Sequence, residues 1–164
     1  MANKLRTLDD LFQEQLKDLY SAETQLLAAL PKMAARANDP LLKAAFESHL
    51  QETQQQQQRL DFLGQRMNLD LNGHTCHAMK GLLKEGDEMM AEDAEPEARD
   101  AGLIACAQRV EHYEISGYGT ARHFAERLGY AETARVLEQS LQEEQNADTK
   151  LNDLAKSRIN EKAM

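Results

Sequence analysis

The chain has 164 residues, and its 28 Asp and Glu residues outnumber its 19 Lys and Arg residues, for a formal net charge of −9. This excess of acid argues against a dedicated nucleic-acid-binding protein, which needs a basic face. No stretch approaches the roughly 18 unbroken apolar residues of a membrane-spanning helix, and the segment Met1–Arg6 lacks the apolar region of a secretory signal. We therefore expect no membrane association and a cytoplasmic location.

Two long helices are predicted for the first part of the chain. The first begins after Thr7, which together with Asp10 has the form of a capping box, and an apolar stripe follows at steps of three and four residues. Asp39 and Pro40 then suit the N-cap and the first position of a second helix, which runs to about Met67.

The second part of the chain repeats this plan after a connector. Residues 68–95 form the connector and contain one shorter helical stretch from Cys76 to about Ala91. Two further long helices are predicted, from Pro96 to Leu128 and from Tyr130 to about Arg158. We expect residues 157–164 to fray.

This layout predicts an all-α fold. The short turn within each pair of long helices forces the pair to be antiparallel, and the long connector returns the chain along the bundle. The predicted architecture is a ferritin-like antiparallel four-helix bundle. A long crossover that carries a short helix joins its second and third helices, and residues 1–164 form one domain.

Each long helix carries at least one acidic residue on its apolar stripe, where an amphipathic helix normally has none. Burial of a carboxylate is costly unless it is paired or coordinates a metal. Because antiparallel helices bring their middles to one level, we expect these acids to lie close together. The main candidate ligands are Glu23, Glu52, Glu114 and Glu144, with Glu111, Asp148 and His49 as a second rank.

A pair of divalent metal ions would relieve the repulsion within such a cluster, because carboxylates bridge metals and neutralise them. Oxygen-rich sites with an occasional imidazole suit iron or manganese, so two divalent ions of one of these metals are the expected cofactors. For any single acid the alternatives are a place at the edge of the stripe, a side chain that extends to the solvent, or a buried salt bridge, with partners among Lys43, Arg59, Arg109, Arg122 and Arg127.

Aromatic and thiol groups near these acids are expected to be structural. Core packing with a hydrogen-bonded hydroxyl group is the expected role of three tyrosines, Tyr20, Tyr113 and Tyr118. Cys76 is expected to pack under the crossover rather than to bind zinc with His74 and His77.

A series of motifs runs in order through nearly the whole chain: Thr7–Phe12 (TLDDLF), Leu16–Glu23 (LKDLYSAE), Leu27–Met33 (LAALPKM), His49–Thr53 (HLQET), Cys76–Met79 (CHAM), Val110–Ile115 (VEHYEI) and Glu143–Glu144 with Asp148. In these motifs the chain resembles the YciE/YciF-type family of ferritin-like stress-response proteins. The resemblance implies a ferritin-like bundle with a dinuclear metal site and an association with stress responses. It does not define a reaction.

The ferritin-like ligand pattern takes one Glu from each of two helices and Glu-x-x-His from each of the other two. Glu23 and either Glu114 or Glu111 match the single positions in this pattern. Glu52 and Glu144 match the paired positions.

The chain departs from the pattern at both histidines, since Gln55 and Ala147 stand in their places. His49, Gln56 and Asp148 lie about one turn from the paired acids and are the available substitutes. The resulting ligand set would be richer in oxygen than usual, which favours manganese or a labile site.

Two functions from different classes follow. The first is a dinuclear metal-binding protein of the stress response that handles peroxide, dioxygen or metal by redox chemistry. An oxidoreductase of the ferroxidase, peroxidase or catalase type is compatible with it, although no catalytic residue is identified. The alternative is a non-enzymatic stress-associated bundle that acts by self-association or partner binding, with the core acids in a polar network. A homodimer is the expected assembly, and a related bundle protein is a second candidate partner.

Overall fold

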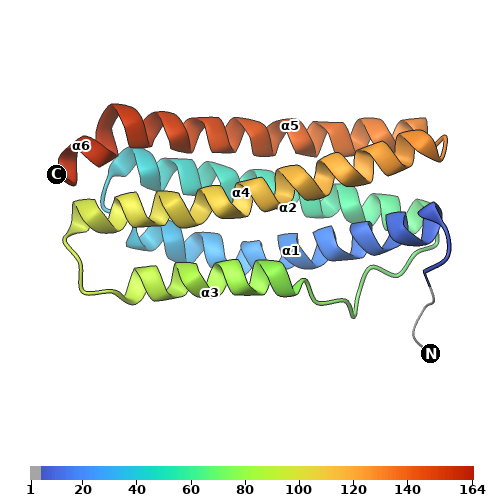
Figure 1. Cartoon of the computed structure of the whole chain (residues 1–164), viewed down its shortest axis with the longest axis horizontal. Helices are drawn as coiled ribbons and strands as arrows, with labels where there is room; N and C mark the ends of the chain where they lie inside the picture. The colour runs from blue at the N-terminus through green and yellow to red at the C-terminus, as the bar shows by residue number, and fades with distance from the viewer. Residues whose placement is uncertain (1–4) are drawn as a thin grey trace.

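The computed structural model describes residues 5–164, and every regular element in that range is helical, as predicted. Four long helices and one shorter helix make up most of the fold (Figure 1): α1 Leu8–Arg36, α2 Pro40–Arg66, α3 His77–Ala91, α4 Pro96–Arg127 and α5 Ala131–Leu154. The last of these continues through a π-helical turn, Ala155–Ile159, into the short helix α6, Asn160–Lys162. None of these helices is long and apolar enough to cross a bilayer.

Local sequence explains where α1 and α2 begin. The Thr7 hydroxyl accepts a hydrogen bond from the Asp10 backbone N–H at 3.1 Å, and the Asp10 carboxylate accepts one from the Thr7 N–H at 2.9 Å. This is the predicted capping box. Asp39 caps α2 by accepting from the Leu41 N–H at 2.9 Å, and Pro40 occupies the first helical position.

The helices pack in two sequential pairs. The chain reverses at residues 37–39 and 128–130, so that α1 packs mainly against α2 and α4 against α5. The pairs meet through contacts of α1 with α4 and of α2 with α5. The crossover helix α3 lies along α1 and α4 at the lower edge of the view in Figure 1.

A glycine allows α1 to approach α4 closely near the middle of both helices. A β-carbon at Gly117 would lie 2.9 Å from the Leu19 Cδ2 atom, which is closer than real β-carbons are found. Leu19 lies about one turn before Glu23, and Gly117 lies about one turn after Glu114. The close approach therefore occurs next to two of the candidate acids.

The hydrophobic core is divided into two clusters along the helix axes. Leu26 of α1 and Val110 of α4 belong to one cluster, whereas Leu19 of α1 and Tyr118 of α4 belong to the other. Buried polar side chains occupy the level between them, and every long helix contributes at least one. We term this set the polar layer, which consists of Glu23, His49, Thr53, Gln56, Glu111, Glu114 and Glu144.

The end of the chain departs from the expected fraying of residues 157–164. Helix continues to Lys162, and Ile159 is only 1% exposed. Arg158 Nε and Lys162 Nζ contact an oxygen of the Asp39 carboxylate at 2.6 and 2.9 Å. One buried apolar side chain and two ion pairs thus hold this segment against the turn between α1 and α2.

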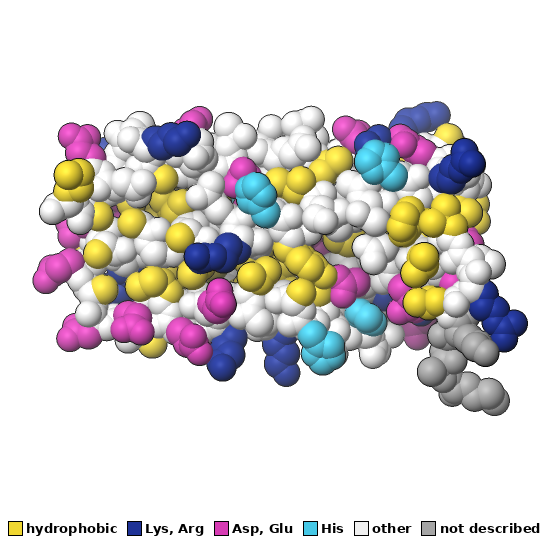
Figure 2. All heavy atoms as spheres, viewed as in Figure 1, with side chains coloured by type: hydrophobic (Ala, Val, Ile, Leu, Met, Phe, Trp, Pro, Cys, Tyr) yellow, Lys and Arg dark blue, Asp and Glu magenta, His cyan; other side chains and the backbone are white. Residues whose placement is uncertain are grey.

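Most of the negative charge lies on the surface. Only six of the 28 acidic residues are buried, and four of those six belong to the polar layer. Figure 2 shows acidic side chains gathered at the end of the molecule where α3 connects to α4, and this connection contains the exposed residues Glu92, Asp93 and Glu95. The net charge therefore describes the surface, while the buried minority of acids defines the candidate site.

Candidate metal centre

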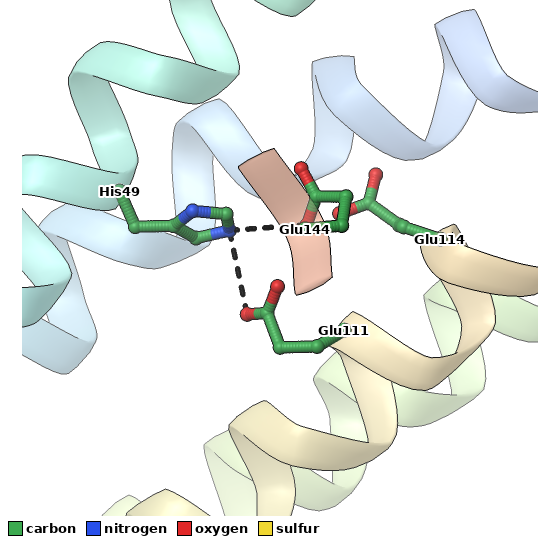
Figure 3. Close-up of side chains that lie close together, drawn as sticks. All are labelled: His49, Glu111, Glu114 and Glu144. Atoms are coloured by element: carbon green, nitrogen blue, oxygen red, sulfur yellow. Dashed lines mark ion pairs between the residues drawn. The ribbon is translucent and has the colours of Figure 1, made fainter. Parts of the chain in front are cut away.

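Three helices bring four potential metal ligands together inside the polar layer. His49 comes from α2, Glu111 and Glu114 from α4, and Glu144 from α5, and one ligand atom of each lies within 4.8 Å of the others. Figure 3 shows the imidazole ring and the carboxylates gathered around a common space. The His49 Nε2 atom is 3.3 Å from Glu111 Oε1 and 3.7 Å from Glu144 Oε2. Ligands about 2.0–2.2 Å from one cation lie at most about 4.4 Å apart, so this spacing needs little adjustment to coordinate a cation.

Glu23 belongs to the same layer but has a different immediate environment. It is fully buried on α1, and the Tyr118 hydroxyl of α4 donates a hydrogen bond to its Oε1 atom. In the same way, the Gln56 side-chain amide of α2 donates to Oε1 of Glu144. Each of these two carboxylates therefore has one oxygen held by a neutral donor and a second oxygen without a hydrogen-bond partner.

The polar layer as a whole is short of hydrogen-bond partners. Among the described residues, ten buried side-chain nitrogen or oxygen atoms have no hydrogen-bond partner, and eight of them belong to this layer. Both carboxylate oxygens of Glu114 and the Nε2 atom of His49 are among the eight. Buried polar groups are nearly always satisfied in folded proteins, and each unsatisfied one costs about 1–3 kcal/mol. Such a concentration of acceptors in one place fits a bound cation.

Burial and mutual repulsion raise the pKa values of three of the acids. The pKa values of Glu23 and Glu111 lie well above the ordinary 4.5, because of burial first and the nearby charge of Glu144 second. Burial also raises the pKa of Glu114, and the charge of Glu23 is the next cause. These carboxylates therefore release their protons less readily than ordinary glutamates, and nearby positive charge would favour their ionised forms.

The imidazole of the site is under opposing influences. Burial alone would lower the pKa of His49, but the carboxylates of Glu144 and Glu52 outweigh burial, and the pKa is raised. The surroundings of His49 therefore favour a positive charge, whether it is carried by the ring or by a cation beside it.

The remaining two candidate ligands lie at the rim of the layer. The Glu52 side chain is 29% exposed, and its Oε2 atom is 3.3 Å from Nδ1 of His49, the ring nitrogen that does not face Glu111 and Glu144. The Asp148 side chain is 23% exposed, accepts a hydrogen bond from Gln108 at 3.1 Å and lies 3.3 Å from the exposed His112 ring. Both acids thus contact side chains other than the carboxylates of the layer.

Cys76 packs under the crossover, as predicted. It is buried at the start of α3, where its thiol lies 3.3 Å from the Asp18 carboxylate and 3.1 Å from the Tyr113 hydroxyl. His74 also contacts Asp18, whereas His77 is exposed. The Tyr113 and Tyr118 hydroxyls are both hydrogen-bonded to carboxylates, which confirms the expectation for these two tyrosines.

Thr53 is the one member of the polar layer that sequence analysis does not single out as a site residue. It is fully buried, and its hydroxyl oxygen has no hydrogen-bond partner. The signal in the sequence is its position four residues after His49, which places both residues on the same face of α2.

Comparison with known proteins agrees with the resemblance found in the motifs. The model of a family described as "Domain of unknown function (DUF892)" matches residues 7–164. The chain is 44% identical to Protein YciF of Escherichia coli (strain K12) over 160 residues, which cover 97% of this chain and 96% of YciF.

Solved structures of similar proteins share the fold. The crystal structure of the E. coli stress protein YciF matches with a TM-score of 0.91 at 44% identity, over 95% of this chain and 99% of that one. YcfI of Rhodopseudomonas palustris, provisionally described as a structural protein, matches with a TM-score of 0.89 at 43% identity, over 93% of this chain and 97% of YcfI. A protein from Xanthomonas campestris pv. campestris has a TM-score of 0.74 at 22% identity over 92% of both chains, which supports the fold alone. The chain belongs to the DUF892 family and is a homologue of the stress protein YciF.

Proposed function

We propose that the chain is a ferritin-like dinuclear metal-binding protein of the stress response. The observation that carries this proposal is the set of eight buried polar atoms without hydrogen-bond partners in the polar layer. The order of the helices supports the ferritin-like assignment, because two helix pairs with short turns are joined by one long crossover.

Charge balance supports two divalent ions rather than one. Four glutamates of the layer, Glu23, Glu111, Glu114 and Glu144, are at most 2% exposed. Two divalent cations carry +4 and would neutralise four carboxylates at −4, with a neutral His49. With all four ionised, one cation would leave about two buried negative charges uncompensated, which is costly at such depth. The oxygen-rich donor set with one imidazole suits iron or manganese.

The residues divide the work of holding these ions. His49, Glu111, Glu114 and Glu144 would hold one cation, since their ligand atoms already lie together. Glu23 would hold a second cation together with Glu114 and Glu144. These three carboxylates are close enough that the charge of Glu144 raises the pKa of Glu23, and the charges of Glu23 and Glu144 raise that of Glu114. Both oxygens of Glu114 lack partners, which suits a carboxylate shared between two cations.

Neighbouring side chains would orient these ligands. Glu52 contacts Nδ1 of His49, so that Nε2 faces the other ligands. Tyr118 and Gln56 each hold one oxygen of a ligand carboxylate. The two hydrophobic clusters on either side of the polar layer would limit access of water along the helix axes.

Iron or manganese bound in this way would supply redox chemistry with dioxygen or peroxide. The chain would then act as an oxidoreductase of the ferroxidase, peroxidase or catalase type, or handle metal under stress. The description of YciF as a stress protein supports the physiological setting. A homodimer remains the proposed assembly.

The alternative function is a non-enzymatic bundle whose core acids form a polar network. The hydrogen bonds from Tyr118 to Glu23 and from Gln56 to Glu144 favour this alternative. With the acids ionised, however, it leaves eight buried atoms of the layer without partners, and it therefore explains less of the structure.

Metal analysis of protein purified without chelator or affinity-tag metal distinguishes the two functions. We expect about two equivalents of iron or manganese per chain. Glu144→Gln should lose most of this metal. Glu143→Gln is the matched control, because Glu143 is the adjacent acid but pairs with Arg59 at 2.6 Å outside the layer. Absence of metal after reconstitution with either ion would support the polar network instead.

A further inference from the structure

A narrow pocket connects the surface with the polar layer between α2 and α5. Its inner end is formed by His49 and Glu111, which are 5% and 2% exposed. Its outer end includes Lys150, which is exposed, and Glu52, which is partly exposed. The pocket therefore runs from solvent to the side chains that would hold a cation.

Two alanines leave the space that forms this pocket. Ala45 of α2 and Ala147 of α5 both line it. Ala147 stands three residues after Glu144, where the ferritin-like pattern has a histidine. Because protein interiors are close-packed, a histidine or other large side chain at this position would fill the space.

The size and charge of the pocket restrict what can pass. It has room for about one water molecule, so only molecules of one or two heavy atoms fit without movement of the helices. The outer end presents one basic and one acidic side chain, Lys150 and Glu52, and so does not select strongly for an anion or a cation. Small uncharged molecules fit the volume of the pocket, and they need no charge selection at its outer end.

The residues at the inner end of the pocket have polar atoms without hydrogen-bond partners. The Nε2 atom of His49 and the Oε2 atom of Glu111 are buried there without hydrogen-bond partners. A small molecule in the pocket would therefore lie against two of the residues that would hold a cation.

We propose that this pocket is the route by which dioxygen, hydrogen peroxide or water reaches the metal site, and that Ala147 sets its width. The proposal rests on the proposed metal site. It adds the route that these small uncharged molecules would take and a residue that controls the route. Ala147 has no side-chain atom that could bind a cation, so its proposed role is in access alone.

The probe for this proposal is nitric oxide, which is diatomic and uncharged. The full-length chain is loaded with Fe(II) without oxygen, and its iron content is measured. The association rate of nitric oxide is then followed by stopped-flow absorbance and the product by electron paramagnetic resonance. These signals report access to iron without any turnover.

Ala147→Leu should retain its iron and bind nitric oxide about tenfold more slowly, because access then waits for local opening of the helices. Ala147→Gly should bind it several-fold faster, and this variant decides the matter if Ala147→Leu does not fold. Ala134→Leu is the matched control, since Ala134 is also buried on α5 but belongs to the hydrophobic cluster away from the pocket.

The outcomes separate this proposal from the metal site itself. Iron in all variants, with equal association rates for Ala147→Leu, Ala147→Gly and the unmodified chain, would overturn the access route alone. Failure of the unmodified chain to take up iron would overturn the proposed iron site and the route with it. Slowing in Ala134→Leu equal to that in Ala147→Leu would show a general effect of packing and would also overturn the route.

Discussion

Tyr118 on α4 donates its hydroxyl hydrogen to Oε1 of Glu23 on α1, while Oε2 of Glu23 is buried with no hydrogen-bond partner. The tyrosine is itself fully buried, and its pKa is raised well above 10 by burial and by the charge of Glu23. The hydroxyl therefore stays protonated and serves as a donor. It holds one oxygen of the carboxylate and leaves the other without a hydrogen-bond partner, available to the proposed cation.

Tyr118→Phe should weaken metal binding by about 10–100-fold, because loss of a group that orients a ligand typically has this effect. Competition with a chelator of known affinity measures the change. Tyr130→Phe is the control, since the Tyr130 hydroxyl bonds Asp9 at the surface at 2.9 Å. Equal affinity in Tyr118→Phe and the unmodified chain would show that the hydroxyl does not position a ligand.

Glu114→Gln should stabilise the metal-free protein by about 1–3 kcal/mol at neutral pH, because an amide cannot ionise and so removes a buried group that burial and the charges of Glu23 and Glu144 disfavour as a carboxylate. The same variant should bind less metal than the unmodified chain. Urea unfolding in chelator and metal analysis measure the two effects. Glu47→Gln, on the exposed side of α2, should change neither. A loss of stability in metal-free Glu114→Gln would contradict this account of the layer.

The metal-free protein should lose stability as the pH rises above the ordinary glutamate value of 4.5. The pKa values of Glu23, Glu111 and Glu114 are raised in the folded chain, so the folded state holds protons that the unfolded state has released. The stabilisation that comes from these bound protons is complete below pH 4.5. It is lost as the pH rises through the raised pKa values of the three glutamates.

The midpoint of urea unfolding, measured at a series of pH values from 4.5 upward, tests the prediction. One series contains chelator, and the other contains bound metal. The midpoint in chelator should fall with increasing pH. With metal it should change little, because the cations replace the protons. A midpoint in chelator that rises with pH through this range would mean that these acids are ionised at little cost in the folded chain.

Asp39→Asn should destabilise the protein by about 1 kcal/mol at neutral pH, since Asn still caps a helix but cannot pair with Arg158 and Lys162. Burial raises the pKa of Asp39, but hydrogen bonds from Lys162 and Arg158 outweigh burial and lower it to about 2. The contribution of this lowered pKa is present above the ordinary 3.8 and is lost as the pH falls through about 2.

The difference in unfolding free energy between Asp39→Asn and the unmodified chain should therefore disappear near pH 2. Glu161→Gln is the control, because Glu161 lies on the same terminal helix and is exposed. A difference that persists unchanged at pH 2 would assign the effect to the cap rather than to the ion pairs.

Much of the helical layout is predictable because its determinants are local. The Thr7–Asp10 capping box and the Asp39–Pro40 start depend on residues within a few positions of each other. The continuation of helix to Lys162 is not predictable in this way. It depends on ion pairs with Asp39, which lies more than a hundred residues earlier in the chain.

In the candidate site, too, the features that depend on local sequence are predictable and those that depend on distant contacts are not. An acid on an apolar stripe is visible in the sequence, and Glu23, Glu114 and Glu144 are all fully buried. The relative placement of His49 and Glu52 is not visible, because residues three apart share a helix face and only packing decides which of them points inward. The bond between Tyr118 and Glu23 joins residues 95 positions apart and requires the assembled bundle.

The most direct test of the central claim is anomalous X-ray diffraction from crystals of metal-loaded protein, recorded on both sides of the iron and manganese absorption edges. We predict two peaks inside the polar layer, one among His49, Glu111, Glu114 and Glu144 and one beside Glu23, with Glu114 in contact with both. Anomalous maps without a peak in the layer, from protein shown by analysis to be supplied with both metals, would contradict the dinuclear site.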